Sequence, residues 1–119
     1  MSAEEAVVSE ATPDGVVRGL PATRVARVAD LPPGEGRAFA VAGEQVAVFR
    51  LRTGALHAVS AVCPHRGGPI ADGQTDARVV MCPLHGNTFE LATGACLTGQ
   101  RPLSVFPVAE EDGWVVVGG

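Results

Sequence analysis

Two cysteine–histidine couplets constrain the fold of this chain more than any other feature of its sequence. The first is Cys63-Pro64-His65 and the second is Cys82-Pro83-Leu84-His85, with the sixteen residues 66–81 between them. Two thiolates and two imidazoles are enough to complete a four-ligand metal site. The couplets alone therefore predict that two segments, far apart in the sequence, meet at one point of the fold.

The ligand types and the flanking residues narrow the kind of metal centre. Cysteine and histidine together select zinc or an iron–sulfur cluster. The first couplet continues as Arg66-Gly67-Gly68-Pro69 and the second as Gly86-Asn87-Thr88. Rigid loops rich in Gly and Pro favour a two-iron cluster, with one iron held by both Cys and the other by both His. A structural zinc module is the alternative from a different class, because the same four side chains can bind Zn²⁺.

At these residues the sequence resembles the Rieske family. The pattern C-x-H, about sixteen residues, then C-P-x-H-G is specific to that family, and the likeness extends over residues 25–117. The resemblance implies a Rieske-type [2Fe-2S] cluster near the tip of an antiparallel β fold. Its ligands would be Cys63, His65, Cys82 and His85.

Short apolar stretches between turn residues indicate an all-β fold. No segment shows a helical period with caps, and eight short strands at such spacing predict a Rieske-like antiparallel sandwich or small barrel. The two couplets then lie on loops that form a cluster-binding subdomain. The expected strands are Arg24–Val28, Arg37–Val41, Gln45–Arg50, Ala55–Ser60, Val79–Met81, Thr88–Leu91, Val105–Val108 and Trp114–Val117.

The first nineteen residues differ in character from the rest of the chain. They are acidic and lack periodicity, which predicts a disordered tail over residues 1–19 and one Rieske domain over residues 20–119. The N-terminus has no signal-peptide pattern and no apolar run is long enough to cross a bilayer, so we expect a cytoplasmic protein without a membrane partner. Four of the thirteen acids precede Gly15, and the other nine match nine arginines. No basic face for nucleic acid is expected.

The remaining residues do not supply an active site. A Rieske oxygenase needs a further mononuclear iron site with two His, and His57 is the third and last histidine of the chain. No glycine fingerprint for a flavin or nicotinamide cofactor is present. We therefore expect an electron-transfer module or subunit that works with a catalytic partner and has no complete active site of its own.

Two partner systems are consistent with the resemblance. The stretches Gln45–Leu51 and Phe89–Leu97 look like the small subunit of an NAD(P)H-dependent assimilatory nitrite reductase, which would make the large subunit of that enzyme the partner. The alternative is the free ferredoxin of an aromatic-ring dioxygenase system. Such a ferredoxin would take electrons from a flavin-dependent NAD(P)H reductase and pass them to a terminal oxygenase.

The resemblance also implies a low reduction potential. High-potential members carry an extra cysteine in each loop and a serine after the His-Gly of the second couplet. Leu84 and Asn87 occupy two of these places. We therefore expect a potential in the lower part of the Rieske range, which spans roughly −150 to +300 mV.

Overall fold

The apolar run Val46–Phe49 lies in the central strand of the fold, β5 (Glu44–Arg50). In the computed structural model, the described residues are 10–11, 15–62, 69–76, 78–83, 86–99 and 101–119. Strand β5 belongs to a four-stranded antiparallel sheet of order β10-β6-β5-β4. The other strands of this central sheet are β4 (Glu35–Val41), β6 (Leu56–Ser60) and β10 (Val105–Phe106).

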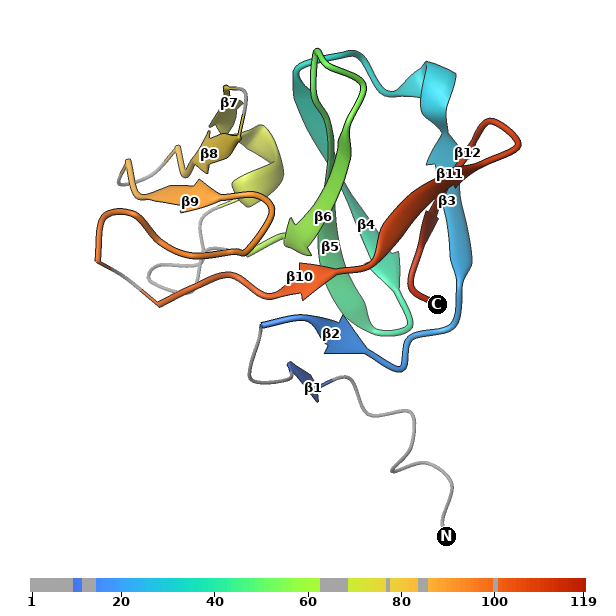
Figure 1. Ribbon diagram of the computed structural model, residues 1–119, viewed down its shortest axis with the longest axis horizontal. Helices are drawn as coiled ribbons and strands as arrows, with labels where there is room; N and C mark the ends of the chain where they lie inside the picture. Colours follow the sequence, from blue (N-terminus) through green and yellow to red (C-terminus); the bar gives the residue numbers. More distant parts are fainter. Residues whose placement is uncertain (1–9, 12–14, 63–68, 77, 84–85, 100) are drawn as a thin grey trace, which may run out of the picture.

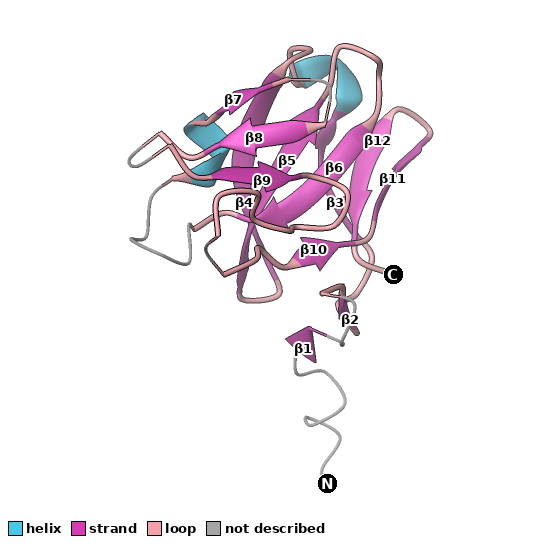
Figure 2. Cartoon of the chain, turned by 60° about the vertical axis from the view of Figure 1, so that its left-hand side comes forward, coloured by secondary structure: helices cyan, strands magenta, loops and turns pink. Residues whose placement is uncertain are grey.

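Two three-stranded sheets cover the two faces of the central sheet (Figure 1). One has the order β11-β12-β3, with β3 (Thr23–Arg27), β11 (Val108–Glu111) and β12 (Trp114–Val117). The other has the order β7-β8-β9, with β7 (Gln74–Thr75), β8 (Val79–Met81) and β9 (Thr88–Glu90). Figure 2 shows β8 and β9 lying across β5 and β6.

The smaller elements complete the fold. Strands β1 (Glu10–Ala11) and β2 (Val17–Arg18) pair with each other near the N-terminus. Two single-turn 3₁₀ helices, η2 (Val28–Asp30) and η3 (Ile70–Asp72), connect strands. None of the helices in the described part of the chain is long and apolar enough to cross a membrane.

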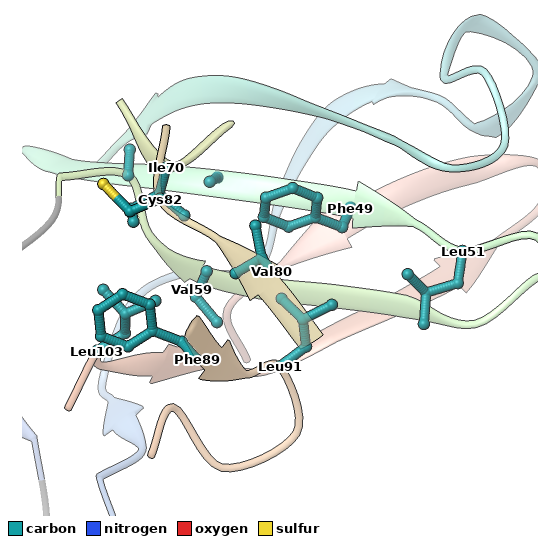
Figure 3. Close-up of a cluster of buried hydrophobic side chains, with 11 residues drawn as sticks. Phe49, Leu51, Val59, Ile70, Val80, Cys82, Phe89, Leu91 and Leu103 are labelled. Carbon is teal, nitrogen blue, oxygen red and sulfur yellow. The ribbon is translucent and has the colours of Figure 1, made fainter. Parts of the chain in front are cut away.

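Alternation along β5 produces two separate cores. Side chains of consecutive strand residues point to opposite faces, and a strand covered on both faces reads as a continuous apolar run. One face carries the core that we call the Phe49 core, made of Ala47, Phe49, Leu51, Val59, Ala61, Ile70, Val80, Cys82, Phe89, Leu91 and Leu103 (Figure 3). The other carries the Val48 core, made of Val17, Leu20, Leu31, Val41, Val46, Val48, Ala58, Phe106, Val115 and Val117.

Two tight hairpins build the long strands around the Val48 core. Ala42 and Gly43 join β4 to β5 with φ of 48° and 86°, and Asp112 and Gly113 join β11 to β12 with φ of 53° and 83°. Positive φ at both central residues is the type I′ geometry, which matches the twist of the flanking strands. Each turn lies in the gap between two strands that the sequence predicted separately.

The all-β prediction is confirmed, and each of the eight expected strands is present within a few residues of its predicted bounds. One expected strand, Val105–Val108, is divided at Pro107 into β10 and β11. The two parts belong to different sheets, because β10 pairs with β6 and β11 pairs with β12. Proline has no N–H for a strand ladder, so it stands where the chain leaves one sheet for the other.

The N-terminal boundary differs from the sequence-based expectation. The domain was expected to begin at residue 20, but Val17 and Leu20 are both buried in the Val48 core. Val16 forms a parallel bridge with Val105, whose N–H donates to the Gly15 carbonyl at 2.9 Å. The folded part therefore includes residues from Gly15 onward. Residues 1–9 and 12–14 of the predicted tail lie outside the described residues.

Candidate metal centre

One of the four predicted ligands lies in the described part of the chain. Cys82 follows β8 directly and is 1% exposed. Cys63, His65 and His85 lie outside the described residues, as do Arg66 and Leu84. The structure therefore defines the site through Cys82 and through the residues where each couplet loop begins and ends, which we call the loop roots.

The root of the first loop is a short antiparallel contact. Val62 pairs with Pro69 across the loop, and the Ile70 N–H donates to the Ala61 carbonyl at 2.9 Å. Ala61 and Ile70 are both buried in the Phe49 core. The chain therefore leaves the core at Ala61 and returns to the same place at Ile70.

The root of the second loop is the end of the β8–β9 hairpin. Met81 pairs with Thr88, and the Cys82 N–H donates to the Asn87 carbonyl at 2.8 Å. The Cys82 carbonyl in turn accepts from the Gly86 N–H at 3.0 Å, which closes a single tight turn. Gly86 has φ of +73°, a conformation that a residue without a Cβ adopts at little cost. Cys82 is thus fixed by its backbone on both sides.

The two roots are neighbours, as the couplets predicted. Helix η3 follows the first root, and Gly73 at its end packs against β8. A Cβ built on Gly73 would stand 2.3 Å from the Met81 carbonyl oxygen and 2.8 Å from the side chain of Val80. Gln74 then pairs with Met81 in the β7–β8 ladder. The backbone after the first loop therefore runs beside β8, the strand that ends directly before Cys82.

The Cys82 side chain lies at one end of the Phe49 core. Figure 3 shows it beside Ile70, with the ring of Phe49 farther along the core. Cys82 also borders a surface hollow together with Asp72, Gln74, Pro83 and Gly86. A buried cysteine that lies at the end of an apolar core and also borders a surface hollow at the second loop root suits a metal ligand.

Comparison with known proteins identifies the family. The profile of the Rieske [2Fe-2S] domain matches residues 22–107 of this chain. The chain belongs to the Rieske [2Fe-2S] domain family. The match includes both couplets, both loop roots and all strands from β3 to β10.

Solved Rieske structures of similar size share this fold. The ferredoxin of carbazole 1,9a-dioxygenase from Nocardioides aromaticivorans is 31% identical, with a TM-score of 0.76 over 82% of this chain and 96% of that chain. A putative NADH-dependent nitrite reductase small subunit from Mycobacterium tuberculosis is also 31% identical, with a TM-score of 0.78 over 82% of this chain and 94% of that chain.

Some Rieske relatives are far longer. The cholesterol 7-desaturase of Hemicentrotus pulcherrimus is 31% identical over 100 residues, which are 74% of this chain but 21% of that protein. The chain thus spans about a fifth of the length of this curated relative. The similarity therefore covers the Rieske domain and leaves most of the longer protein unmatched.

The cofactor of this Rieske protein is a [2Fe-2S] cluster of the Rieske type. The structure fits such a group at Cys82, since a thiolate is the ligand that iron–sulfur clusters use and this buried residue borders the hollow that the second loop root forms with Asp72 and Gln74. When bound, the cluster supplies a centre that takes up and gives back one electron. The chain's own contribution is to hold the ligands and to limit the access of water.

A hydrogen-bond group behind the second loop root was missed by sequence reasoning. Asn87 is buried, and its Oδ1 accepts from the Thr98 hydroxyl at 2.8 Å. The sulfur of Cys96 lies 3.2 Å from the same hydroxyl. A threonine eleven residues after Asn87 has no motif that marks it. The position of Asn87 close to a predicted ligand could have served as a signal. A buried amide there needs a hydrogen-bond partner, and that requirement points to a polar side chain such as Thr98.

The third histidine lies outside the candidate site. His57 is half-buried on β6, where it pairs with Phe49 of β5. Burial lowers the pKa of His57 below its ordinary value of 6.5. This position opposite Phe49 suits a structural role for His57.

Proposed function

We propose that this Rieske protein carries single electrons between an NAD(P)H-oxidising reductase and a catalytic partner protein. In this proposal Cys63 and Cys82 bind one iron of the cluster, and His65 and His85 bind the other. The adjacent loop roots and the buried thiol of Cys82 support this ligand set.

The position of the exposed apolar side chains is the observation that carries the proposal. Among the described residues, the large hydrophobic side chains left exposed are Val62, Met81 and Leu97, at 48%, 44% and 57%. Val62 immediately precedes Cys63 and Met81 immediately precedes Cys82. Leu97 lies beside the second root, because its N–H donates to the Thr88 carbonyl at 2.7 Å. Apolar surface gathered at the metal end of the molecule favours contact with a protein there.

For the catalytic partner we propose the large subunit of a nitrite reductase. The solved small subunit from Mycobacterium tuberculosis supports this assignment, and so does the stretch Phe89–Leu97. In the structure this stretch includes most of β9 and the segment that pairs with it beside the second root. The stretch Gln45–Leu51 is weaker support, because it corresponds to β5 and its apolar residues are set by the two cores.

The second candidate is the ferredoxin of a ring-hydroxylating dioxygenase. It is favoured by the carbazole dioxygenase ferredoxin, which matches over nearly its whole length. The terminal oxygenase would then be the acceptor. Both candidates use the same metal end and differ in the protein that docks on it.

A stopped-flow experiment separates the two candidates. The reduced protein is mixed without oxygen with the nitrite reductase large subunit or with a terminal oxygenase of the source organism, and reoxidation of the cluster is followed by its visible absorbance. Reoxidation by the large subunit at a rate that rises with its concentration is the expected result. Reoxidation by the oxygenase alone would reject the nitrite reductase assignment and support the second candidate.

The cluster and its potential are tested on the isolated protein. About two irons and two sulfides per chain are expected, with a rhombic electron paramagnetic resonance signal after reduction, whereas colourless protein holding zinc would reject the ligand proposal. We propose a midpoint near or below about −100 mV, toward the bottom of the Rieske range. A midpoint above about +100 mV would contradict the low-potential assignment. The cytoplasmic location stays a prediction.

A further inference from the structure

Asn87 is the one buried polar side chain among the residues that the structure describes, with 8% exposure. It stands at the exit of the second couplet loop, between Gly86 and Thr88. A buried amide costs free energy unless its oxygen and nitrogen find hydrogen-bond partners. The hydrogen-bond partner of Asn87 Oδ1 therefore identifies a contact that holds the end of the second couplet loop in place.

That partner is the hydroxyl of Thr98, which serves three neighbours at once. The Thr98 hydroxyl donates to Asn87 Oδ1 at 2.8 Å and accepts from the Thr88 N–H at 3.3 Å. The Cys96 sulfur is 3.2 Å from it. A threonine hydroxyl has one hydrogen and two lone pairs. Since its hydrogen is given to Asn87, the Cys96 thiol is the donor in the third contact.

The segment that carries Thr98 is itself attached to β9. Cys96 forms an antiparallel β-bridge with Phe89. The Leu97 N–H donates to the Thr88 carbonyl at 2.7 Å, and the Glu90 N–H donates to the Ala95 carbonyl at 2.8 Å. Residues 95–97 therefore run as a further antiparallel edge beside β9. Thr98 is placed by this ladder at the point where β9 meets the loop.

Only two contacts separate Thr98 from the predicted ligand. The side chain of Asn87 is held by Thr98, and the carbonyl of the same Asn87 accepts from the Cys82 N–H at 2.8 Å. Holding Oδ1 also fixes the side-chain amide in one orientation, with its two N–H donors turned away from Thr98. Loss of the Thr98 hydroxyl would release that amide and loosen the loop exit at Cys82.

We propose that Thr98 is a positioning residue for the cluster, acting through Asn87 on the loop that carries Cys82 and His85. The proposal rests on the ligand set given under the proposed function. Groups that orient metal ligands from behind commonly change metal affinity by about 10- to 100-fold when removed. Thr98 is placed to act in this way, although no sequence motif includes it.

The test uses Thr98→Val, which removes the hydroxyl and keeps the shape of the side chain. We expect cluster loss to an iron chelator, followed by visible absorbance, to be about 10-fold faster than in the wild-type protein. The midpoint potential and the g values of the reduced cluster should shift as well. Thr98→Ser, which retains the hydroxyl, should restore the wild-type rate and spectrum.

Thr93→Val is the matched control. Thr93 is also an exposed residue of the same hairpin, where its hydroxyl donates to Glu90 Oε1 at 2.7 Å and accepts from the Ala95 N–H at 3.2 Å. It stabilises the end of the hairpin farthest from the loop. Thr93→Val should leave the cluster unchanged. If it accelerates cluster loss as much as Thr98→Val does, general weakening of the hairpin explains the effect and the proposal is rejected.

A double-mutant cycle with Asn87→Ala decides whether the two residues act together. The proposal requires that Thr98→Val has little further effect once Asn87 is truncated, and independent, multiplying effects on the rate would overturn it. Thr98→Ala replaces Thr98→Val in the cycle if the valine variant does not fold. Cys82→Ser is measured in parallel. If that variant keeps a normal cluster, the ligand set itself is wrong, which is distinct from an unaltered Thr98→Val in a protein that needs Cys82.

Discussion

The two faces of the central sheet are built in different ways, although both rest on the same strands. The Val48 core is covered by β3, β11 and β12, which have five, four and four residues and include a type I′ hairpin. The Phe49 core is covered by β7, β8 and β9, which have two, three and three residues. Cys82, the predicted ligand within the described residues, lies on the side with the shorter strand ladders.

The difference shows what positions a metal site in a small β domain. Short strands leave few ladder bonds, so the sheet over the Phe49 core relies on side-chain packing, on the close approach of Gly73 to Met81 and on the Asn87–Thr98 contact. With the proposed ligands, the cluster would add a further link there between the two loops. We therefore expect changes to the Phe49 core to affect both stability and the cluster, and changes to the Val48 core to affect stability alone.

Removal of a predicted ligand should have the largest effect. Cys82→Ala should abolish the visible absorbance and the stoichiometric iron, because a thiolate cannot be replaced by a methyl group. Amide hydrogen exchange should become faster in β8 and β9 and stay slow in β12, which contributes Val115 and Val117 to the Val48 core. Cys96→Ala is the control and should keep its iron. Normal iron content in Cys82→Ala would refute the ligand assignment.

A matched pair of phenylalanines compares the two cores directly. Phe89 is 0% exposed in the Phe49 core and Phe106 is 2% exposed in the Val48 core. Each change to alanine should lower the free energy of unfolding by about 3–5 kcal/mol, measured by denaturant titration of the cluster-free protein. In the loaded protein, Phe89→Ala should also accelerate cluster loss well beyond Phe106→Ala. Equal acceleration by both would mean that the two cores respond as one unit.

A pair of glycines tests the junction between the loop roots. Gly73→Ala places a Cβ against the Met81 carbonyl and should destabilise the protein by about 1–3 kcal/mol while shifting the midpoint potential. Gly43→Ala meets no atom within 4 Å but has φ of +86°, so it should cost about 1–2 kcal/mol through backbone strain alone. Thermal melts and redox titrations of both variants give the comparison. An unchanged potential in Gly73→Ala would show that the junction does not influence the cluster.

The smallest effect should come from His57, at the edge of the Phe49 core. Because burial lowers its folded pKa below 6.5, the unfolded chain binds more protons as the pH falls below that value. Stability should therefore be lost as the pH falls from 6.5 through the lowered folded pKa, by less than about 1 kcal/mol for a half-exposed group. In His57→Gln this part of the pH dependence should vanish. The difference between the two proteins, measured by urea unfolding, removes the contributions of His65 and His85, and identical profiles would contradict the assignment.

The sequence by itself determined the longer strands, the all-β class and the family, whereas the two-residue strands β1, β2 and β7 were not predicted. Alternating apolar residues and turn glycines are local signals, and the couplet spacing is read without any knowledge of distance. The turn at Asp112-Gly113 and the strand at Trp114–Val117 follow from such signals. The ligand roles of Cys63, His65, Cys82 and His85 also come from the sequence and stay predictions, and Cys82 alone of the four lies in the described part of the chain.

Tertiary structure alone decided how the parts meet. No local pattern announces that Gly73 packs against Met81, that Val105–Val108 divides at Pro107 between two sheets, or that Thr98 donates to Asn87. Each of these contacts joins segments whose pairing depends on which faces of the strands are already covered. Local periodicity can identify Val46–Phe49 as a strand buried on both faces, but it does not identify the segments that pack on those two faces.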